Sequence, residues 1–105
     1  MEVNLLKKII KEKEAIIVYF SGENCSVCKV LQPKIKETIK NNFEKINFLE
    51  IKTEDYPLTC GEYSIFSIPA VLVFLDGKEF ARYGRNISIA QFIQNTSRPY
   101  NLLFG

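Results

Sequence analysis

The feature that most constrains this chain is a pair of cysteines between a predicted buried strand and a predicted helix. Cys25 and Cys28 are separated by two residues and follow the apolar run 15–20. Two cysteines at this spacing can lie on one helical turn, close enough for a disulfide to open and close. A cysteine at a helix start also forms its thiolate easily, because the free N–H groups and the helix dipole favour negative charge there. The arrangement indicates redox chemistry.

Composition narrows the classes of protein that remain. The chain has 105 residues, which predicts a single domain over residues 1–105. The net charge is +2 with lysines and glutamates intermixed, which is not the pattern of a nucleic-acid-binding or membrane-binding face. Neither a membrane span of ~20 apolar residues nor a signal peptide is seen. We therefore expect a cytoplasmic monomer, in which a C-x-x-C pair is catalytic or metal-binding rather than structural.

Hydrophobic periodicity predicts elements in the order α-β-α-β-α-β-β-α. This order implies an α/β fold with a central mixed sheet and helices on both faces. Asp76-Gly77 is a hairpin signal, Ser88 is the expected cap of the last helix, and Pro99 is expected to end it, leaving a short apolar tail. The expected helices cover about residues 2–13, 25–42, 55–63 and 88–96, and the expected strands cover about 15–20, 46–52, 70–75 and 78–83.

The two cysteines are assigned different roles by their position. Cys25, at the helix start, is the candidate nucleophile, and Cys28, one turn in and nearer the core, is the candidate resolving thiol. A zinc site is the metal alternative, but structural zinc takes four ligands, and the chain has three cysteines and no histidine. We therefore expect no metal and no cofactor.

The segment Ile68-Pro69 is a second candidate site at the start of the third predicted strand. Proline donates no ladder hydrogen bond, so the first residue of a strand suits it. A trans bond that simply begins the strand is the ordinary alternative, since cis X-Pro bonds are rare. A cis bond would leave the Ile68 backbone exposed beside Cys25, ready to pair with an extended substrate segment.

These residues together resemble the thioredoxin family. The resemblance implies a thioredoxin-like fold, thiol–disulfide exchange on protein substrates, a cis Pro69 facing Cys25, and an electron donor of the thioredoxin-reductase kind. The matching residues are Phe20, Glu23, Cys25, Cys28, Lys29, Pro33, Pro57, Tyr63, Ile65, Ile68, Pro69, Gly77 and Gly84.

Several positions depart from the family pattern. Asn24 replaces a tryptophan before the first cysteine, and Ser26-Val27 replaces Gly-Pro, which alters the surface where a reductase would bind. Tyr19 takes the place of a buried aspartate and is a poor base at neutral pH. Glu50 falls where the family has a lysine. We expect either that Glu50 transfers protons with Cys28, its pKa raised by burial, or that it is a surface strand residue.

The family's first strand is also expected to be missing, which leaves a four-stranded sheet. The favoured function is a protein-disulfide reductase, and the alternative is a thioredoxin-like module that binds peptides without turnover. Cys60 is expected to be a small buried hydrophobe, with a regulatory thiol or an intermolecular disulfide as alternatives. The phenylalanines, Phe66 and Phe80 among them, are expected to be core residues.

Overall fold

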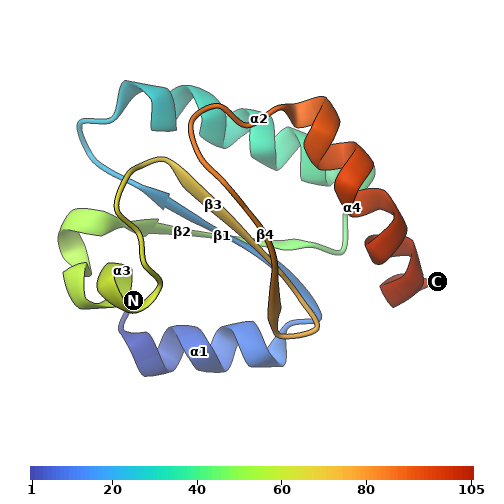
Figure 1. Ribbon diagram of the computed structural model, residues 1–105, viewed down its shortest axis with the longest axis horizontal. Helices are drawn as coiled ribbons and strands as arrows, with labels where there is room; N and C mark the ends of the chain where they lie inside the picture. Colours follow the sequence, from blue (N-terminus) through green and yellow to red (C-terminus); the bar gives the residue numbers. More distant parts are fainter.

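A four-stranded mixed sheet forms the centre of the computed structural model, which describes residues 1–105 (Figure 1). The predicted element order is confirmed, with one short 3-10 turn added after the second strand. The strands are β1 (Ala15–Ser21), β2 (Asn47–Lys52), β3 (Ala70–Leu75) and β4 (Lys78–Tyr83). The helices are α1 (Val3–Glu12), α2 (Ser26–Asn42), α3 (Pro57–Glu62) and α4 (Ile89–Phe104), and the 3-10 turn is η1 (Thr53–Asp55).

The strands lie in the order β2-β1-β3-β4, with β1 parallel to β2 and antiparallel to β3. Every residue of β1 is buried, as its continuous apolar run predicts for a strand covered on both faces. Phe20 pairs with Ala70 at one end of the two central strands, and Ala15 pairs with Leu75 at the other end. The end of β1 that leads to the cysteines therefore meets the start of β3, directly after Pro69.

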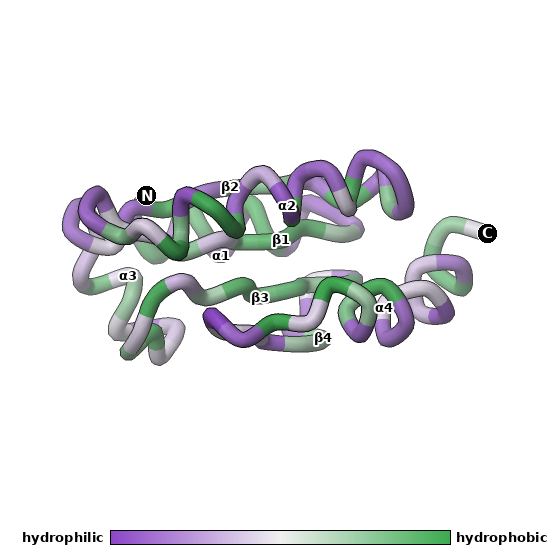
Figure 2. The backbone as a smooth tube through the Cα atoms, turned by 90° about the horizontal axis from the view of Figure 1, so that it is seen from above, coloured by the Kyte–Doolittle hydropathy of each residue, from purple (hydrophilic) through white to green (hydrophobic).

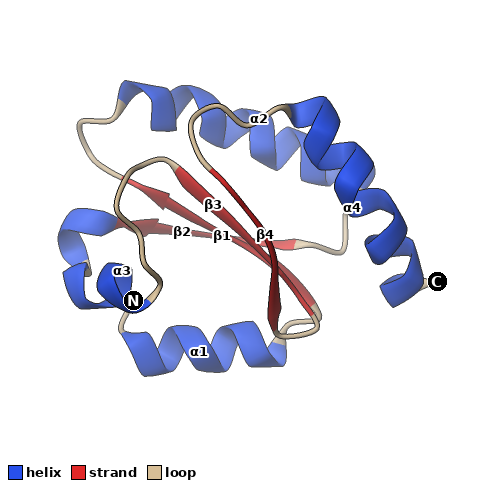
Figure 3. Cartoon of the chain, viewed as in Figure 1, coloured by secondary structure: helices blue, strands red, loops and turns tan.

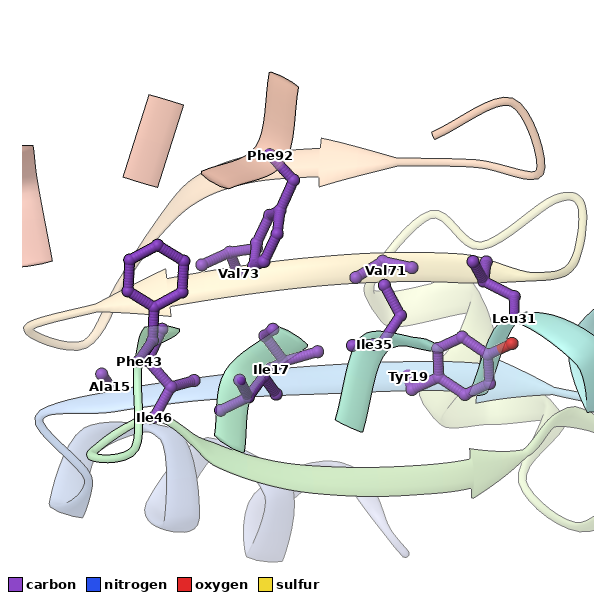
Figure 4. Close-up of a cluster of buried hydrophobic side chains, with 11 residues drawn as sticks. Ala15, Ile17, Tyr19, Leu31, Ile35, Phe43, Ile46, Val71, Val73 and Phe92 are labelled. Carbon is purple, nitrogen blue, oxygen red and sulfur yellow. The ribbon is translucent and has the colours of Figure 1, made fainter. Parts of the chain in front are cut away.

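Alternation along the strands divides the core into two clusters, one on each face of the sheet. Ile17, Tyr19 and Val71 face α2 and α4, where they pack in a cluster that includes Phe43 and Phe92 (Figure 4). The alternate residues face the other two helices and pack with Leu6 and Ile10 of α1 and Cys60 of α3. Figure 3 shows the sheet between these two helical layers. In Figure 2 the central strands β1 and β3 are hydrophobic along most of their length, whereas hydrophobic and hydrophilic residues alternate along the helices.

The turn and cap predictions are confirmed. Asp76 and Gly77 both have positive φ, 53° and 77°, which is the conformation that a tight two-residue hairpin requires. Ser88 caps α4, and its Oγ accepts a hydrogen bond from the Gln91 N–H over 3.2 Å.

The prediction that Pro99 ends the last helix is wrong, because α4 continues through Pro99 to Phe104. A proline inside a helix removes one backbone donor, but the residues after it gain tertiary contacts. The ring of Tyr100 lies 5.1 Å from that of Phe43, and its hydroxyl accepts a hydrogen bond from the Lys45 N–H over 3.1 Å. These contacts hold the last turn in helical form.

Two predicted core aromatics are on the surface. Phe66 is 89% exposed in the turn before Pro69, and Phe80 is 40% exposed on the edge strand β4. Periodicity carries no information on Phe66, which lies outside any regular element, and Phe80 lies on an edge strand that has no buried residue. Cys60 is a free, buried thiol, as expected of a small hydrophobe, and burial raises its pKa.

Candidate functional site

The two cysteines of the C-x-x-C motif form a disulfide at the start of α2. Their Cα atoms lie 5.3 Å apart, within the range that a disulfide requires. Cys25 is partly exposed, whereas Cys28 is only 1% exposed and lies against the sheet. The Cys25 sulfur is thus open to a reaction partner, whereas the Cys28 sulfur is shielded from one.

Cys25 is the N-cap residue of α2. Its Sγ accepts a hydrogen bond from the Cys28 N–H over 3.2 Å, and its backbone oxygen accepts one from the Lys29 N–H. The first N–H groups of a helix have no partner within it, and here one of them points at sulfur. In the reduced protein the same donor and the helix dipole would stabilise a thiolate at Cys25.

Ile68 and Pro69 lie at the same end of the central strands as the cysteines. The Ile68–Pro69 bond is cis, as the resemblance implies, and Pro69 is buried. Gly22 links the two parts of the site, because a Cβ placed on it would lie 2.7 Å from Ile68 Cδ1 and 3.9 Å from Cys25 Cβ. The loop after β1 is also held by the Glu23 N–H, which donates to Glu54 Oε1 over 3.0 Å.

Tyr19 faces the buried side of the motif from strand β1. Burial, with a smaller contribution from the charge of Glu50, raises the pKa of Tyr19 to about 12. The phenol therefore stays protonated at neutral pH and donates its proton in a hydrogen bond to the Cys28 backbone carbonyl. In Figure 4 its ring lies among the aliphatic side chains of the core, close to Leu31 and Ile35.

The expectation that the pKa of Glu50 is raised is wrong. Burial does act in that direction, but hydrogen bonds from Ser21 and Gln32 and the charge of Lys52 together outweigh it, so the pKa is lowered. Ser21 Oγ donates to Glu50 Oε2 over 2.6 Å, and Gln32 Nε2 donates to Oε1 over 3.3 Å. Lys52 Nζ lies 3.5 Å from Oε2.

The residues around Glu50 form a polar cavity beside the buried sulfur. Its volume is about 220 Å³. Sequence reasoning missed Ser21, Gln32 and Lys52, although each leaves a signal. Ser21 is a polar residue at the end of an apolar strand, and Gln32 lies four residues after Cys28 on the same helix face. The residues that line the cavity are Cys28, Lys29, Gln32, Glu50 and Lys52.

The largest surface hollow does not belong to this site. It has a volume of about 540 Å³ and lies between the β3–β4 turn and the last turns of α4. Leu75 lines it, and the sheet register places Leu75 at the end of the central strands that is farthest from Phe20 and the cysteines. No three histidine, cysteine or acidic side chains lie close enough together to hold a metal ion.

Comparison with known proteins agrees with this geometry. The thioredoxin family model matches residues 2–97. The chain belongs to the thioredoxin family. Thioredoxin-like protein YdfQ of Bacillus subtilis (strain 168) is 30% identical over 100 residues, which cover 95% of this chain and 88% of that protein. Thioredoxin 1 of Thermosipho africanus TCF52B is 30% identical with a TM-score of 0.74, and the alignment covers 86% of this chain and 99% of that one.

The fold is confirmed more widely across the family. Oxidised mitochondrial thioredoxin 3 of Saccharomyces cerevisiae has a TM-score of 0.78 over 93% of this chain and 90% of its own, at 17% identity. Membership of the thioredoxin family, together with the Cys25–Cys28 pair, assigns thiol–disulfide oxidoreductase chemistry to the chain. None of its helices is both long enough and apolar enough to cross a membrane.

Proposed function

We propose that this thioredoxin-family protein reduces disulfides in protein substrates through a cycle of Cys25 and Cys28. One observation carries the proposal: a partly exposed sulfur at the N-cap of α2 is paired with a buried one. The first sulfur can reach a substrate, and the second can attack only the intermediate that the first has formed. This division of labour is what a dithiol reductase requires.

In the reduced protein the Cys25 thiolate attacks one sulfur of the substrate disulfide. A mixed disulfide forms, and the other substrate sulfur leaves as a thiolate. Cys28 then loses its proton, and its thiolate attacks the Cys25 sulfur. This second step closes the Cys25–Cys28 disulfide and releases the remaining substrate thiolate, so two electrons pass from the protein to the substrate.

Glu50 is proposed to accept the Cys28 proton in the second step. Its carboxylate lines the same polar cavity as Cys28, and a volume of about 220 Å³ has room for several water molecules. Its pKa lies below the ordinary value, so the carboxylate is ionised at neutral pH and can accept a proton, although the lowered pKa makes it a weaker base. A proton would pass from the thiol through solvent in the cavity to Glu50 and then to bulk water.

Ile68 and Pro69 are proposed to bind the substrate. The Ile68 side chain packs on Gly22, which adjoins Cys25, so a segment paired with the Ile68 backbone would place its disulfide beside Cys25. Residues 1–105 are taken as one functional domain, which acts as a cytoplasmic monomer. A donor of the thioredoxin-reductase kind would restore the dithiol.

The test is reduction of insulin by the purified protein with dithiothreitol as electron source. We expect turnover above the dithiothreitol background with the wild type and none above it with Cys25→Ser. Reduced Cys28→Ser, mixed with insulin in the absence of dithiothreitol, should accumulate a mixed disulfide. If the wild type fails to turn over while Cys25→Ser still binds peptides, the protein is a binding module and the proposal is wrong.

The direction of the reaction is tested by the reduction potential of the cysteine pair, equilibrated in glutathione or dithiothreitol buffers. A value near or below the cytosolic glutathione poise, about −220 to −320 mV, supports a reductase. A value well above it means an oxidant or isomerase and overturns the reductase assignment.

A further inference from the structure

A second surface beside the cysteines is a groove of about 360 Å³ between α2 and the loop that joins β4 to α4. Figure 1 shows this loop passing beside α2. Val30, on the α2 side, is 60% exposed, which is high for a branched aliphatic side chain. The apolar side chains that line the groove are Val27, Val30, Leu31, Ile87 and Ile89.

The groove is also positively charged. Lys34 and Arg85 line it, and no acidic side chain does. Neither cation takes part in any of the three ion pairs of the molecule, nor in a side-chain hydrogen bond. An apolar floor with two unpaired cations is complementary to a ligand that is apolar and acidic.

We propose that this groove binds an extended protein segment in which apolar and acidic residues alternate. Along α2 the groove extends from Ser26 to Lys34, a distance of about 12 Å at the rise of an α-helix. That length accommodates roughly three or four residues of extended chain. An apolar side chain would enter the floor, and its acidic neighbours would lie near Lys34 and Arg85.

The position of the groove connects it to the reaction. Ser26 and Val27 line one end of it, and these residues stand between the two cysteines. Ile68 and Pro69 do not line it, but a Cβ placed on Gly84, next to Arg85, would lie 4.0 Å from the Pro69 backbone oxygen, so the groove adjoins that segment. A preference for reducing substrates that carry such a segment rests on the proposed function. Binding of the segment itself does not.

Binding is tested with two cysteine-free peptides with blocked ends, one of alternating leucine and glutamate and one of alternating leucine and lysine. The readout is the set of NMR methyl signals of Val30, Ile87 and Ile89 in the oxidised protein at low salt. We expect the acidic peptide to shift these signals and the basic peptide to leave them in place. Lys34→Glu and Arg85→Glu should each weaken binding about two- to fivefold, as expected for exposed ion pairs.

The matched control is Lys40→Glu, which makes the same charge change on an exposed position of α2 outside the groove. It should bind the acidic peptide as the wild type does. Equal binding of both peptides, or an equal loss in Lys40→Glu, would overturn the proposal. Identical shifts with free acetate at the same carboxylate concentration would assign the groove to small anions and also overturn it.

A kinetic experiment separates this proposal from the proposed function. The same two segments are attached to one disulfide-bonded loop, and the reduction rates are compared. If neither peptide is reduced but the acidic one binds the groove, the reductase proposal fails and the groove proposal stands. If both are reduced at the same rate without a difference in binding, the groove proposal fails and the reductase proposal stands.

Discussion

The Tyr19 hydroxyl donates a hydrogen bond to the backbone carbonyl of Cys28 over 2.7 Å. This contact joins the central strand to the first turn of α2, and so it fixes the cysteine motif to the most buried part of the sheet. A tyrosine at this position supplies a neutral donor, because its pKa is raised to about 12. Proton transfer with Cys28 therefore has to involve another group, and Glu50 is the carboxylate that shares a cavity with it.

Replacement of Tyr19 by phenylalanine should lower the free energy of unfolding by about 1 kcal/mol, the net contribution of one neutral hydrogen bond. The shape of the pH–activity profile between pH 6 and 8 should not change, because the phenol does not titrate there. Urea unfolding of the oxidised protein and insulin reduction at several pH values measure the two effects.

Tyr83 provides the control for this substitution. Its hydroxyl is buried without a hydrogen-bond partner, and its ring packs edge-on against Phe92. Tyr83→Phe removes an unsatisfied polar group, so stability should stay the same or rise. A loss as large as that of Tyr19→Phe would show that the Tyr19–Cys28 contact has no special role.

A methyl group at Gly22 should disturb the Ile68 side chain more than the fold. A Cβ there would lie 2.7 Å from Ile68 Cδ1, so Gly22→Ala has to displace the Ile68 side chain. Because Ile68 Cδ1 is the end of a flexible, partly exposed side chain, the loss in unfolding free energy should be at most about 1 kcal/mol, the low end for overpacked sites. Insulin reduction should slow more than reduction of hydroxyethyl disulfide, because only the protein substrate uses the Ile68 edge.

The control is Gly61→Ala in α3, where a Cβ would meet no atom within 4 Å. Alanine is the better helix former, so stability should hold or increase by up to about 1 kcal/mol. If both substrates slow equally in Gly22→Ala, the effect lies on Cys25 itself and Ile68 has no part in substrate binding.

Much of the fold follows from the sequence because strand and helix periods are local properties. Ala15–Phe20 could be assigned as a doubly buried strand from its composition alone, and Asp76-Gly77 as a hairpin turn from its backbone preference. The cysteine pair could also be predicted from the sequence, since the spacing of two residues determines its geometry. In each case the chemistry lies within a few consecutive residues.

The predictions that failed depend on contacts distant in sequence. Burial would raise the pKa of Glu50, but Lys52 and hydrogen bonds from Ser21 and Gln32, which come 29 and 18 residues before it, lower it. The helix continues past Pro99 because Tyr100 meets Phe43 and Lys45, more than fifty residues earlier. Neither pairing can be inferred from local spacing.

The last turn of α4 should contribute measurably to stability through Tyr100. Tyr100→Ala removes ring contacts with Phe43 and Phe104 and the hydrogen bond from the Lys45 N–H. We expect a loss of about 2 kcal/mol, below the range for a fully buried aromatic residue. Leu102→Ala, in the same turn but 77% exposed, should change stability by less than about 0.5 kcal/mol. Equal losses in urea unfolding would contradict the packing explanation.

Glu50 should make stability depend on pH in the acid range. Its pKa in the folded protein lies below the ordinary value of 4.5, so ionisation of this group favours the folded state at neutral pH. That contribution is lost as pH falls from about 4.5 through the folded pKa. The wild type and Glu50→Gln should therefore differ in unfolding free energy at pH 7 and converge at low pH. Parallel curves between pH 7 and 3 would contradict the lowered pKa.

The same substitution tests the proposed proton transfer. Glu50→Gln keeps the shape of the side chain but cannot accept a proton, so the mixed disulfide with insulin should persist longer. We expect its resolution to slow by on the order of tenfold, which is below the usual range for a directly positioned base. Attack by Cys25 should be unaffected. Acid quenching and gel separation of the intermediate measure the two steps. Glu79→Gln is the control, since Glu79 also has a lowered pKa, caused mainly by its hydrogen bonds with Arg82, but lies outside the cavity. Unchanged resolution in Glu50→Gln across pH 6 to 8 would exclude Glu50 as the acceptor.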